Sequence, residues 1–507
     1  MKDNTIPVLS PNSSVIHQEK TLERDAIAAA PDRYAERVMA CWLGKAVGGT
    51  LGMPFEGQDG PLDLNFYRPV PTEMLPNDDL DLQVVWACVI NELETARVDR
   101  HILAQAWLDH VEFPWDEYGV AIRNLRNGLK APLTGSFDNW FKNGMGSPIR
   151  SEIWACLAPG DPELAAAYAY EDACVDHSDE GIWGEMFFAA LESMAFVESD
   201  TDILLDRSLA VLPADSMVRY AVADTRRWWK RTRDWRSVRE LILRDYGHEN
   251  FTDAPMNIAF TILGWLAGEG DFSRAICIAV NCGKDTDCTG ATVGALMGIL
   301  DPAGIPDRWL APIGRDLVLS SGIAGLHPPA TLDDFTDLVI ALRRRLDGRR
   351  PNAAKFEQST DHLKVRAAVG FLNEMPSPSA EFDLPANASE VIFDGTIGRW
   401  PTESFEDEYL VVRYPFKVDA AGSVLALFNT RDACQVRVDG QLLFARESRS
   451  MAPSFHRTQD VKAVELAAGQ HTLTAIVKRP KERAEAEWVV GIGDPKSQQW
   501  LPGALLA

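Results

Sequence analysis

Residues 283–300 read GKDTDCTGATVGALMGIL and join an acidic start to an apolar segment that carries a glycine at every fourth position. Gly290, Gly294 and Gly298 advance by slightly more than one helical turn each, so they form a narrow stripe of small residues. An interior glycine costs a helix about 0.8–1.0 kcal/mol relative to alanine. We therefore expect this stripe to be retained for close packing against a second helix.

A second glycine ladder lies near the start of the chain. Gly44, Gly48 and Gly52 have the same spacing of four residues. Packing one ladder against the other predicts that the acidic helix starts near residues 78 and 285 approach each other. The GxxxG pattern also occurs in membrane dimers, but Lys45 and the short apolar runs argue against that interpretation.

Two acidic segments open predicted helices. The segment PNDDLDLQ, residues 76–83, crowds three carboxylates into four residues, and Asp285 and Asp287 lie in otherwise apolar surroundings. Buried acids do not stay ionised without partners, and Mg²⁺ prefers carboxylate, carbonyl and hydroxyl oxygens. The alternatives are an N-cap with a solvated acidic first turn for the first segment, and neutralisation by Lys284 for the second.

Three loops supply further candidates, each with a structural alternative. Glu56 lies at the Gly/Pro turn GMPFEG, where a general acid or base can project; an ordinary loop glutamate is the alternative. The glycine-rich segment NGMGSPIR, residues 143–150, is suited to contact a ligand through backbone N–H groups or to serve as a connector. His177 precedes a predicted helix, where it binds substrate, orients a carboxylate or has a structural role.

The periodicity of the chain predicts two kinds of domain. Apolar residues recur at three- and four-residue spacing from residue 34 to about 345, as in residues 80–98, 181–197, 258–267 and 289–300, which predicts an all-α domain. Short strand-like runs follow at 390–393, 409–418, 423–428, 434–438, 441–445, 471–477 and 487–492. Asp439-Gly440 indicates a hairpin, and the strands predict a β-sandwich or jelly roll.

The predicted organisation has four parts. We expect a loose leader over residues 1–30, the all-α catalytic domain over 31–346, a linker over 347–383 and a β-sandwich accessory domain over 384–507. The linker rests on DGRRP at 347–351 and on PSPSA at 376–380.

The composition of the 507 residues is that of a soluble globular protein, with 46% hydrophobic and 24% charged residues. A net charge of −24 argues against nucleic acid or an anionic membrane as partner. No stretch has the apolar length of a transmembrane helix or the core of a signal peptide, so we expect a cytoplasmic protein. None of the eight cysteines forms a CxxC pair, which predicts reduced thiols.

The order of these motifs resembles that of the ADP-ribosylglycohydrolase superfamily, the family of ADP-ribosylarginine hydrolases and nitrogenase-reductase-activating glycohydrolases. The resemblance covers about residues 34–345 and rests on Gly52-x-Pro54-x-Glu56, Asn77-Asp78-Asp79, His177 and Asp285-Thr286-Asp287-Cys288. It implies an all-α fold, a centre of two Mg²⁺ ions, with Mn²⁺ as an alternative, and hydrolysis at an anomeric ribosyl carbon. It implies Glu56 as the catalytic carboxylate.

The resemblance implies Asp78, Asp79, Asp285 and Asp287 as metal ligands, and we add Asn77 and Thr289 as further oxygen donors. The candidate substrate-binding residues come from the loop segments described above and are Gly144, Gly146, Arg150, His177 and Asp179. Two positions depart from the family pattern. Asn77 replaces a metal-binding Thr, and Cys288 replaces a second Thr, although a thiol is a poor ligand for Mg²⁺. Thr289 or water then completes the coordination, or one metal site is weak.

The sequence therefore predicts a Mg²⁺-dependent glycohydrolase that cleaves an N- or O-glycosidic bond of an ADP-ribosyl or related ribosyl or furanosyl conjugate. The alternatives are hydrolysis of a neutral sugar glycoside without an ADP group, a non-catalytic ligand-binding member of the superfamily, and a metal phosphohydrolase. The C-terminal strands favour a carbohydrate ligand for the accessory domain.

Overall fold

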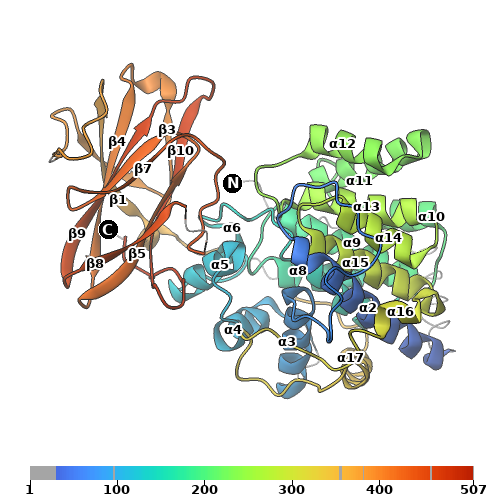
Figure 1. The fold of residues 1–507 in the computed structure, drawn as a ribbon. Helices are drawn as coiled ribbons and strands as arrows, with labels where there is room; N and C mark the ends of the chain where they lie inside the picture. The colour runs from blue at the N-terminus through green and yellow to red at the C-terminus, as the bar shows by residue number, and fades with distance from the viewer. Residues whose placement is uncertain (1–29, 95–96, 353–356, 381, 457–458, 506–507) are drawn as a thin grey trace. The chain divides into compact units, whose positions relative to one another are not determined.

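The computed structural model of the chain describes residues 30–94, 97–352, 357–380, 382–456 and 459–505. It divides the chain into two compact units, which are drawn in Figure 1. The helical unit contains residues up to 111 together with 142–354, and the β-unit contains 112–141 together with 355–507. The predicted leader lies outside the described residues except for Ala30.

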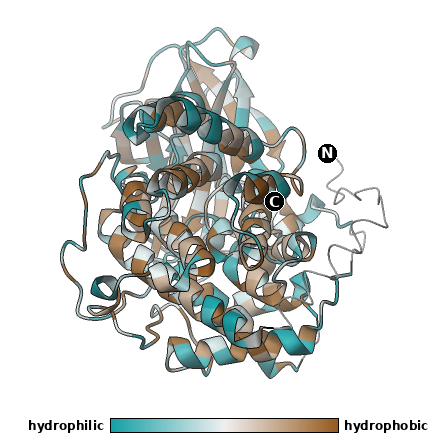
Figure 2. Ribbon diagram, turned by 90° about the vertical axis from the view of Figure 1, so that its right-hand side faces the viewer, coloured by the Kyte–Doolittle hydropathy of each residue, from teal (hydrophilic) through white to brown (hydrophobic). Residues whose placement is uncertain are grey.

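The described part of the helical unit contains helices and short 3₁₀ turns but no β-strand longer than an isolated bridge, which confirms the all-α prediction. Its elements are α2 (Pro31–Gly52), η1 (Met53–Phe55), α3 (Asp78–Glu92), α4 (Arg100–His110), η2 (Pro148–Arg150), α7 (Glu152–Leu157), α8 (Pro162–Ala173), α9 (Glu180–Ala195), α10 (Thr201–Leu209), α11 (Met217–Thr232), α12 (Trp235–Tyr246), α13 (Ala254–Gly268), α14 (Phe272–Asn281), α15 (Thr286–Leu300), η3 (Pro302–Gly304), α16 (Asp307–Leu310) and α17 (Leu332–Leu346). Hydrophilic and hydrophobic colours alternate along many of these helices in Figure 2, as expected for amphipathic helices around a core. No helix within the described ranges is both long and apolar enough to cross a membrane.

Helices α2 and α15 pack ladder against ladder, as the glycine spacing predicts. A Cβ added at Gly48 would lie 1.9 Å from the carbonyl oxygen of Gly290, and one added at Gly52 would lie 2.2 Å from that of Thr286. As residue numbers increase along α2, the residues that it contacts on α15 decrease in number, so the two helices run antiparallel. The Thr286 hydroxyl also donates to the carbonyl oxygen of Gly52 at 2.8 Å. The end of α2 and the start of α15 are therefore held together.

Helix α3 is shorter than its periodicity predicts. It ends at Glu92 instead of near residue 98, and Glu94 has a φ of 49°, which no α-helix continues through. Its first turn is as expected, because the side chain of Asn77 caps it by accepting a hydrogen bond from the backbone N–H of Asp79 at 2.8 Å.

The β-unit contains two antiparallel sheets, as predicted. The strands follow the orders β2-β1-β4-β9-β6-β7 and β3-β10-β5-β8. One hydrophobic core takes side chains from both sheets, which is the arrangement of a β-sandwich. The elements of the unit are α5 (Asp116–Arg126), α6 (Leu133–Ser136), η4 (Asp361–Leu363), β1 (Val365–Leu372), β2 (Ser389–Phe393), β3 (Ile397–Pro401), η5 (Thr402–Ser404), β4 (Tyr409–Val418), β5 (Gly422–Thr430), β6 (Cys434–Val438), β7 (Gln441–Arg446), β8 (Val461–Leu466), β9 (Gly469–Lys478) and β10 (Glu485–Gly493). Asp439 and Gly440 have φ values of 48° and 79° and connect β6 to β7 as the predicted hairpin.

The boundaries of this unit differ from the predicted linker over residues 347–383. Strand β1, Val365–Leu372, lies inside that segment and pairs with both β2 and β4. Residues 112–141 also belong to the β-unit, although they lie within the range predicted as catalytic domain. Both differences have the same cause: these segments are stabilised by partners distant in sequence, which local periodicity does not reveal.

Candidate active site

Three helix ends assemble one cluster of acidic side chains. Glu56 follows η1 at the end of α2, Asp79 lies in the first turn of α3, and Asp285 and Asp287 open α15. Ligand atoms of Glu56, Asp285 and Asp287 lie within 4.8 Å of one another, and so do those of Asp79, Asp287 and Cys288. Because Asp287 belongs to both groups, the two groups form one continuous centre.

The acids at the base of this centre are buried, whereas Glu56 is exposed. Asp79, Asp285 and Asp287 are 1%, 2% and 4% exposed. One carboxylate oxygen of each has no hydrogen-bond partner among the described residues: Asp79 Oδ2, Asp285 Oδ2 and Asp287 Oδ1. Buried carboxylate oxygens without partners are costly, and divalent cations are the natural ligands of such a set. The residues present therefore fit a metal centre.

The electrostatics of the centre lead to the same conclusion. Burial raises the pKa of Asp285, and the neighbouring carboxylates of Asp287 and Glu56 raise it further. Burial, followed by repulsion from Glu56 and Asp78, likewise raises the pKa of Asp287. A bound divalent cation would lower these pKa values again, because its charge reverses the local preference for the neutral form.

Lys45 is the cation that reaches this cluster. Its Nζ donates to Glu152 Oε1 at 2.8 Å and lies 3.4 Å from Asp79 Oδ1, and the side chain is 1% exposed. Burial alone lowers the pKa of Lys45, but the carboxylates of Glu152 and Asp79 outweigh burial and raise it. The sequence assigned no role to Lys45 or Glu152. A lysine inside a helical glycine ladder is the signal that would have identified a buried counter-charge.

Lys284, the alternative counter-charge considered from sequence, is engaged elsewhere. Its Nζ forms an ion pair with Asp59 Oδ1 at 2.5 Å, and its φ of 69° belongs to the turn that precedes α15. Because Lys284 is paired with Asp59, its side chain does not lie between the carboxylates of α3 and α15. The two acidic helix starts therefore meet without the nearest lysine in sequence between them.

The other predicted ligands take different positions. Asn77 places its Nδ2 amide nitrogen 3.4 Å from Asp287 Oδ2, while its Oδ1 caps α3. Asp78 is half-buried and raises the pKa of Asp79 and Asp287. The hydroxyl of Thr289 is buried and donates to the backbone oxygen of Thr286 at 3.2 Å. The oxygens of Asn77 and Thr289 thus contact helix backbone, and their role as ligands stays a prediction.

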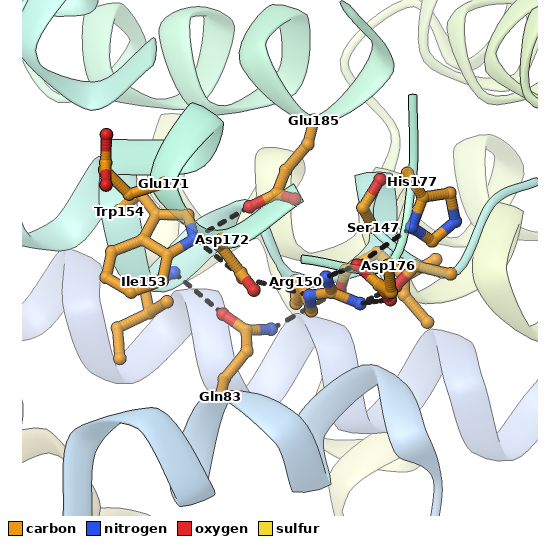
Figure 3. Close-up of polar contacts among 12 residues, drawn as sticks. Gln83, Ser147, Arg150, Ile153, Trp154, Glu171, Asp172, Asp176, His177 and Glu185 are labelled. Carbon is orange, nitrogen blue, oxygen red and sulfur yellow. Dashed lines mark hydrogen bonds and ion pairs between the residues drawn. The ribbon is translucent and has the colours of Figure 1, made fainter. Parts of the chain in front are cut away.

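A second buried ionic network contains Arg150 (Figure 3). Its guanidinium lies between Asp172, at 2.9 Å from Nε, and Asp176, at 2.6 Å from Nη2, and it donates to the carbonyl oxygen of Gly146 at 2.6 Å. Figure 3 places His177 beside Asp176, and the His177 Nδ1 lies 3.0 Å from Asp176 Oδ1. Arg150 and His177 are fully buried. Their burial and contacts favour a structural role, in which they hold the loop before η2 in place.

The last two predicted substrate-binding residues lie near the same loop. Asp179 forms an ion pair with Lys142 at 2.6 Å, and both side chains are half exposed. The backbone of Asp179 has a φ of 49° where the chain enters α9. Gly144 forms an isolated antiparallel bridge with Asp253, the residue before α13. A role in substrate binding stays a prediction for Gly144, Gly146, Arg150, His177 and Asp179.

The comparison with known families agrees with this architecture. The helical fold and its acidic centre fit a class of glycoside-cleaving proteins. Residues 30–345 match the family model described as ADP-ribosylglycohydrolase. This match spans more than half of the 507 residues, so the chain belongs to the ADP-ribosylglycohydrolase family. Membership supports a glycohydrolase-like function. No curated protein matches the sequence.

Three solved structures illustrate weak likenesses to this chain. A structure named "ADP-ribosylglycohydrolase-related protein complex" is 20% identical over 62% of this chain and 99% of that chain, with a TM-score of 0.44. The PA14 domain of the MpAFP antifreeze protein is 10% identical over 30% of this chain and 93% of that chain, with a TM-score of 0.19. A Kluyveromyces marxianus β-glucosidase in complex with glucose is 9% identical over 25% of this chain and 15% of that chain, with a TM-score of 0.18.

Proposed function

We propose that the protein is a metal-dependent glycohydrolase that cleaves the N- or O-glycosidic bond of an ADP-ribosyl or related ribosyl or furanosyl conjugate. One observation carries the proposal: exposed Glu56 lies beside the buried pair Asp285 and Asp287, with ligand atoms within 4.8 Å of one another. A reachable proton-transfer group next to a set of hard-cation ligands is the combination that assisted hydrolysis requires.

The ligands that we assign to two divalent cations, Mg²⁺ with Mn²⁺ as an alternative, are Asp78, Asp79, Asp285 and Asp287. Bound ions supply positive charge that holds vicinal sugar hydroxyls and polarises a water. The carboxylates are held in position because they lie at the ends of α2, α3 and α15, which pack against one another there. Lys45 balances part of the negative charge below Asp79, at 3.4 Å from its Oδ1.

Glu56 is the proton-transfer residue in this mechanism. Its carboxylate is exposed at the edge of the cluster, so it reaches both the solvent and a bound substrate. It takes a proton from the attacking water or donates one to the leaving group. The oxocarbenium-like charge that develops at the anomeric carbon gains from the acidic surroundings.

A neutral glycoside without an ADP group is the second candidate substrate. Cations beside the predicted site residues are paired with carboxylates: Lys45 with Glu152, Lys142 with Asp179, Lys284 with Asp59, and Arg150 with Asp172 and Asp176. A diphosphate needs cations that are free to bind it. This charge distribution favours a substrate with little negative charge.

Hydrolysis assays on matched variants test the proposal. We expect the full chain to release sugar from ADP-ribosyl-arginine, ADP-ribosyl-serine or an aryl furanoside in the presence of Mg²⁺ or Mn²⁺, and to stop in EDTA. Glu56→Gln should lower kcat by about 10²–10⁴-fold and leave metal binding, measured by calorimetry, unchanged. The control is Glu73→Gln, an exposed glutamate.

The outcomes separate the competing functions. Release of inorganic phosphate without sugar release would identify a phosphohydrolase. Metal and ligand binding without turnover of any of these substrates would identify a non-catalytic member of the family. Equal rates for the Glu56→Gln protein and the wild type would assign proton transfer to another group.

For the β-unit we propose carbohydrate binding, on the basis of its two-sheet sandwich architecture. Affinity electrophoresis of the full chain against neutral polysaccharides tests this role. Migration unchanged by every polysaccharide would exclude it.

A further inference from the structure

The acidic centre is not uniform in chemistry. One group, Glu56, Asp285 and Asp287, offers carboxylate oxygens only, whereas the other combines Asp79 and Asp287 with the thiol of Cys288. All eight cysteines are free and buried, but among the described residues the clusters of potential metal ligands contain only Cys288. The two halves of one centre therefore differ in the softness of their donors.

The thiol has carboxylates around it on more than one side. Besides its place among the ligand atoms of Asp79 and Asp287, Cys288 lies close enough to Asp285 for that carboxylate to disfavour its thiolate form. The unpartnered oxygens Asp79 Oδ2 and Asp287 Oδ1 are buried in the same group. A buried thiol in ordinary apolar packing has no reason to lie among such oxygens, so the arrangement indicates a ligand role.

Donor chemistry decides which cation suits each half. Carboxylate oxygens alone suit Mg²⁺ and Mn²⁺, whereas thiolate favours Zn²⁺ and similar d-block ions. Zinc sites combine cysteine with aspartate ligands without conflict. Burial, with repulsion from Asp285 and Asp79, raises the pKa of Cys288. A coordinating divalent cation removes that proton to solvent and replaces the repulsion with attraction.

We propose that the position formed by Asp79, Asp287 and Cys288 takes a thiophilic divalent cation of the Zn²⁺ class, while the position formed by Asp285 and Asp287 beside Glu56 takes a hard cation such as Mg²⁺. The inference rests on the metal dependence proposed above and refines it to a mixed-metal centre, in which Asp287 is shared. The family pattern with threonine in place of Cys288 would hold two hard ions, so this residue sets the metal preference of the present chain.

Cobalt spectroscopy on the full-length protein tests this assignment. After EDTA treatment and dialysis, Co²⁺ is added to protein that already contains excess Mg²⁺, and the near-ultraviolet absorption is recorded. We expect a sulfur-to-cobalt charge-transfer band in the wild type that Zn²⁺ displaces and additional Mg²⁺ does not. Cys288→Thr should abolish the band and lower Cd²⁺ affinity by about tenfold or more, since the loss of even an outer supporting group has that effect on a metal site.

A matched variant controls for the removal of a buried thiol. Cys282→Ser changes a fully buried cysteine near the start of α15 that lies outside both ligand groups, so its band should equal that of the wild type. Both variants are checked for folding by circular dichroism. If Cys288→Thr does not fold, Cys288→Ser provides the same comparison.

Each result has one consequence. Bound Co²⁺ without a charge-transfer band in the wild type, or a band that survives in Cys288→Ser, overturns the thiol ligand and leaves the proposed hydrolase with two hard ions. A wild type that binds neither Mg²⁺ nor Co²⁺ in calorimetry overturns the metal dependence itself. A band that disappears in the Cys288 variants and persists in Cys282→Ser supports the mixed-metal centre.

Discussion

Replacing Gly48 by alanine tests whether the packing of α2 on α15 builds the acidic centre. The added Cβ would lie 1.9 Å from the carbonyl oxygen of Gly290, 2.3 Å from its carbonyl carbon and 2.7 Å from the backbone nitrogen of Ala291. All three obstacles are backbone atoms, so no side-chain rotation relieves them. Restoring an ordinary separation of 3.4 Å requires the helices to move apart by about 1.5 Å.

Such a displacement lowers the free energy of unfolding, and a variant at the neighbouring Gly49 serves as the reference for its size. Overpacking of a core costs about 1–3 kcal/mol, and alanine returns about 1 kcal/mol of helix propensity. A Cβ at Gly49, on the same helix, meets side-chain atoms instead: Asn77 Nδ2 at 3.0 Å, the Cβ of Ala291 at 3.6 Å and Asn77 Cγ at 3.7 Å. Both variants gain the same propensity, so we expect Gly48→Ala to be about 1–3 kcal/mol less stable than Gly49→Ala.

The measurement is urea unfolding of the full chain, followed by tryptophan fluorescence and circular dichroism, together with calorimetric Mg²⁺ binding. Magnesium requires ligand distances near 2.0–2.1 Å, so displacement of α15 from α2 should also weaken metal binding by Asp285 and Asp287. Unfolding free energies that agree within about 0.5 kcal/mol for the two variants would refute the reasoning, because the backbone contact would then have no energetic consequence.

Three further predictions follow from the buried charges. Lys45→Met should lower the free energy of unfolding by about 3–5 kcal/mol, because it leaves the carboxylate of Glu152 without its partner; Lys45→Met with Glu152→Gln should recover most of this loss, and a single variant as stable as the wild type would contradict the pairing. Burial raises the pKa of Asp81 from 3.8 to about 7, so the folded state binds this proton more tightly than the unfolded state and stability falls as pH rises from about 4 to 7. Asp81→Asn should make that slope shallower in urea titrations of the metal-free protein at a series of pH values, because the pKa values of Asp79, Asp285 and Asp287 are raised as well; an unchanged slope would show that Asp81 does not contribute to it. A cation at about 100 times its Kd should stabilise the protein by about 2.7 kcal/mol; thermal unfolding measures this shift, EDTA should reverse it, and a midpoint insensitive to both would exclude a metal centre in the folded state.

The motifs that build the acidic centre could be predicted because they are short and local. The ladder at Gly44, Gly48 and Gly52 and its counterpart in residues 283–300 allow close packing only where a Cβ is missing, so their spacing alone indicates a helix pair. The hairpin at Asp439-Gly440 is equally local, because both residues tolerate positive φ.

Other features depend on partners that local patterns do not contain. Strand β1 forms by pairing with β2 and β4, and the segment before β2 reads as a linker until those partners are known. The buried counter-charge is Lys45 and not Lys284, which likewise depends on contacts between residues distant in sequence. Lys284 is adjacent to Asp285 in sequence, yet its turn directs it to Asp59, whereas Lys45 reaches Asp79 from another helix.

The sequence by itself determined the helical class, the strand-rich second unit and the identity of the acids, since propensity, spacing and turn chemistry are properties of neighbouring residues. Only the tertiary structure decided that one aspartate, Asp287, serves both groups of ligands and that the thiol of Cys288 lies among the carboxylates. The reason is geometric: the distance between side chains on different helices depends on how closely the backbones approach, and that distance is a property of the packed molecule.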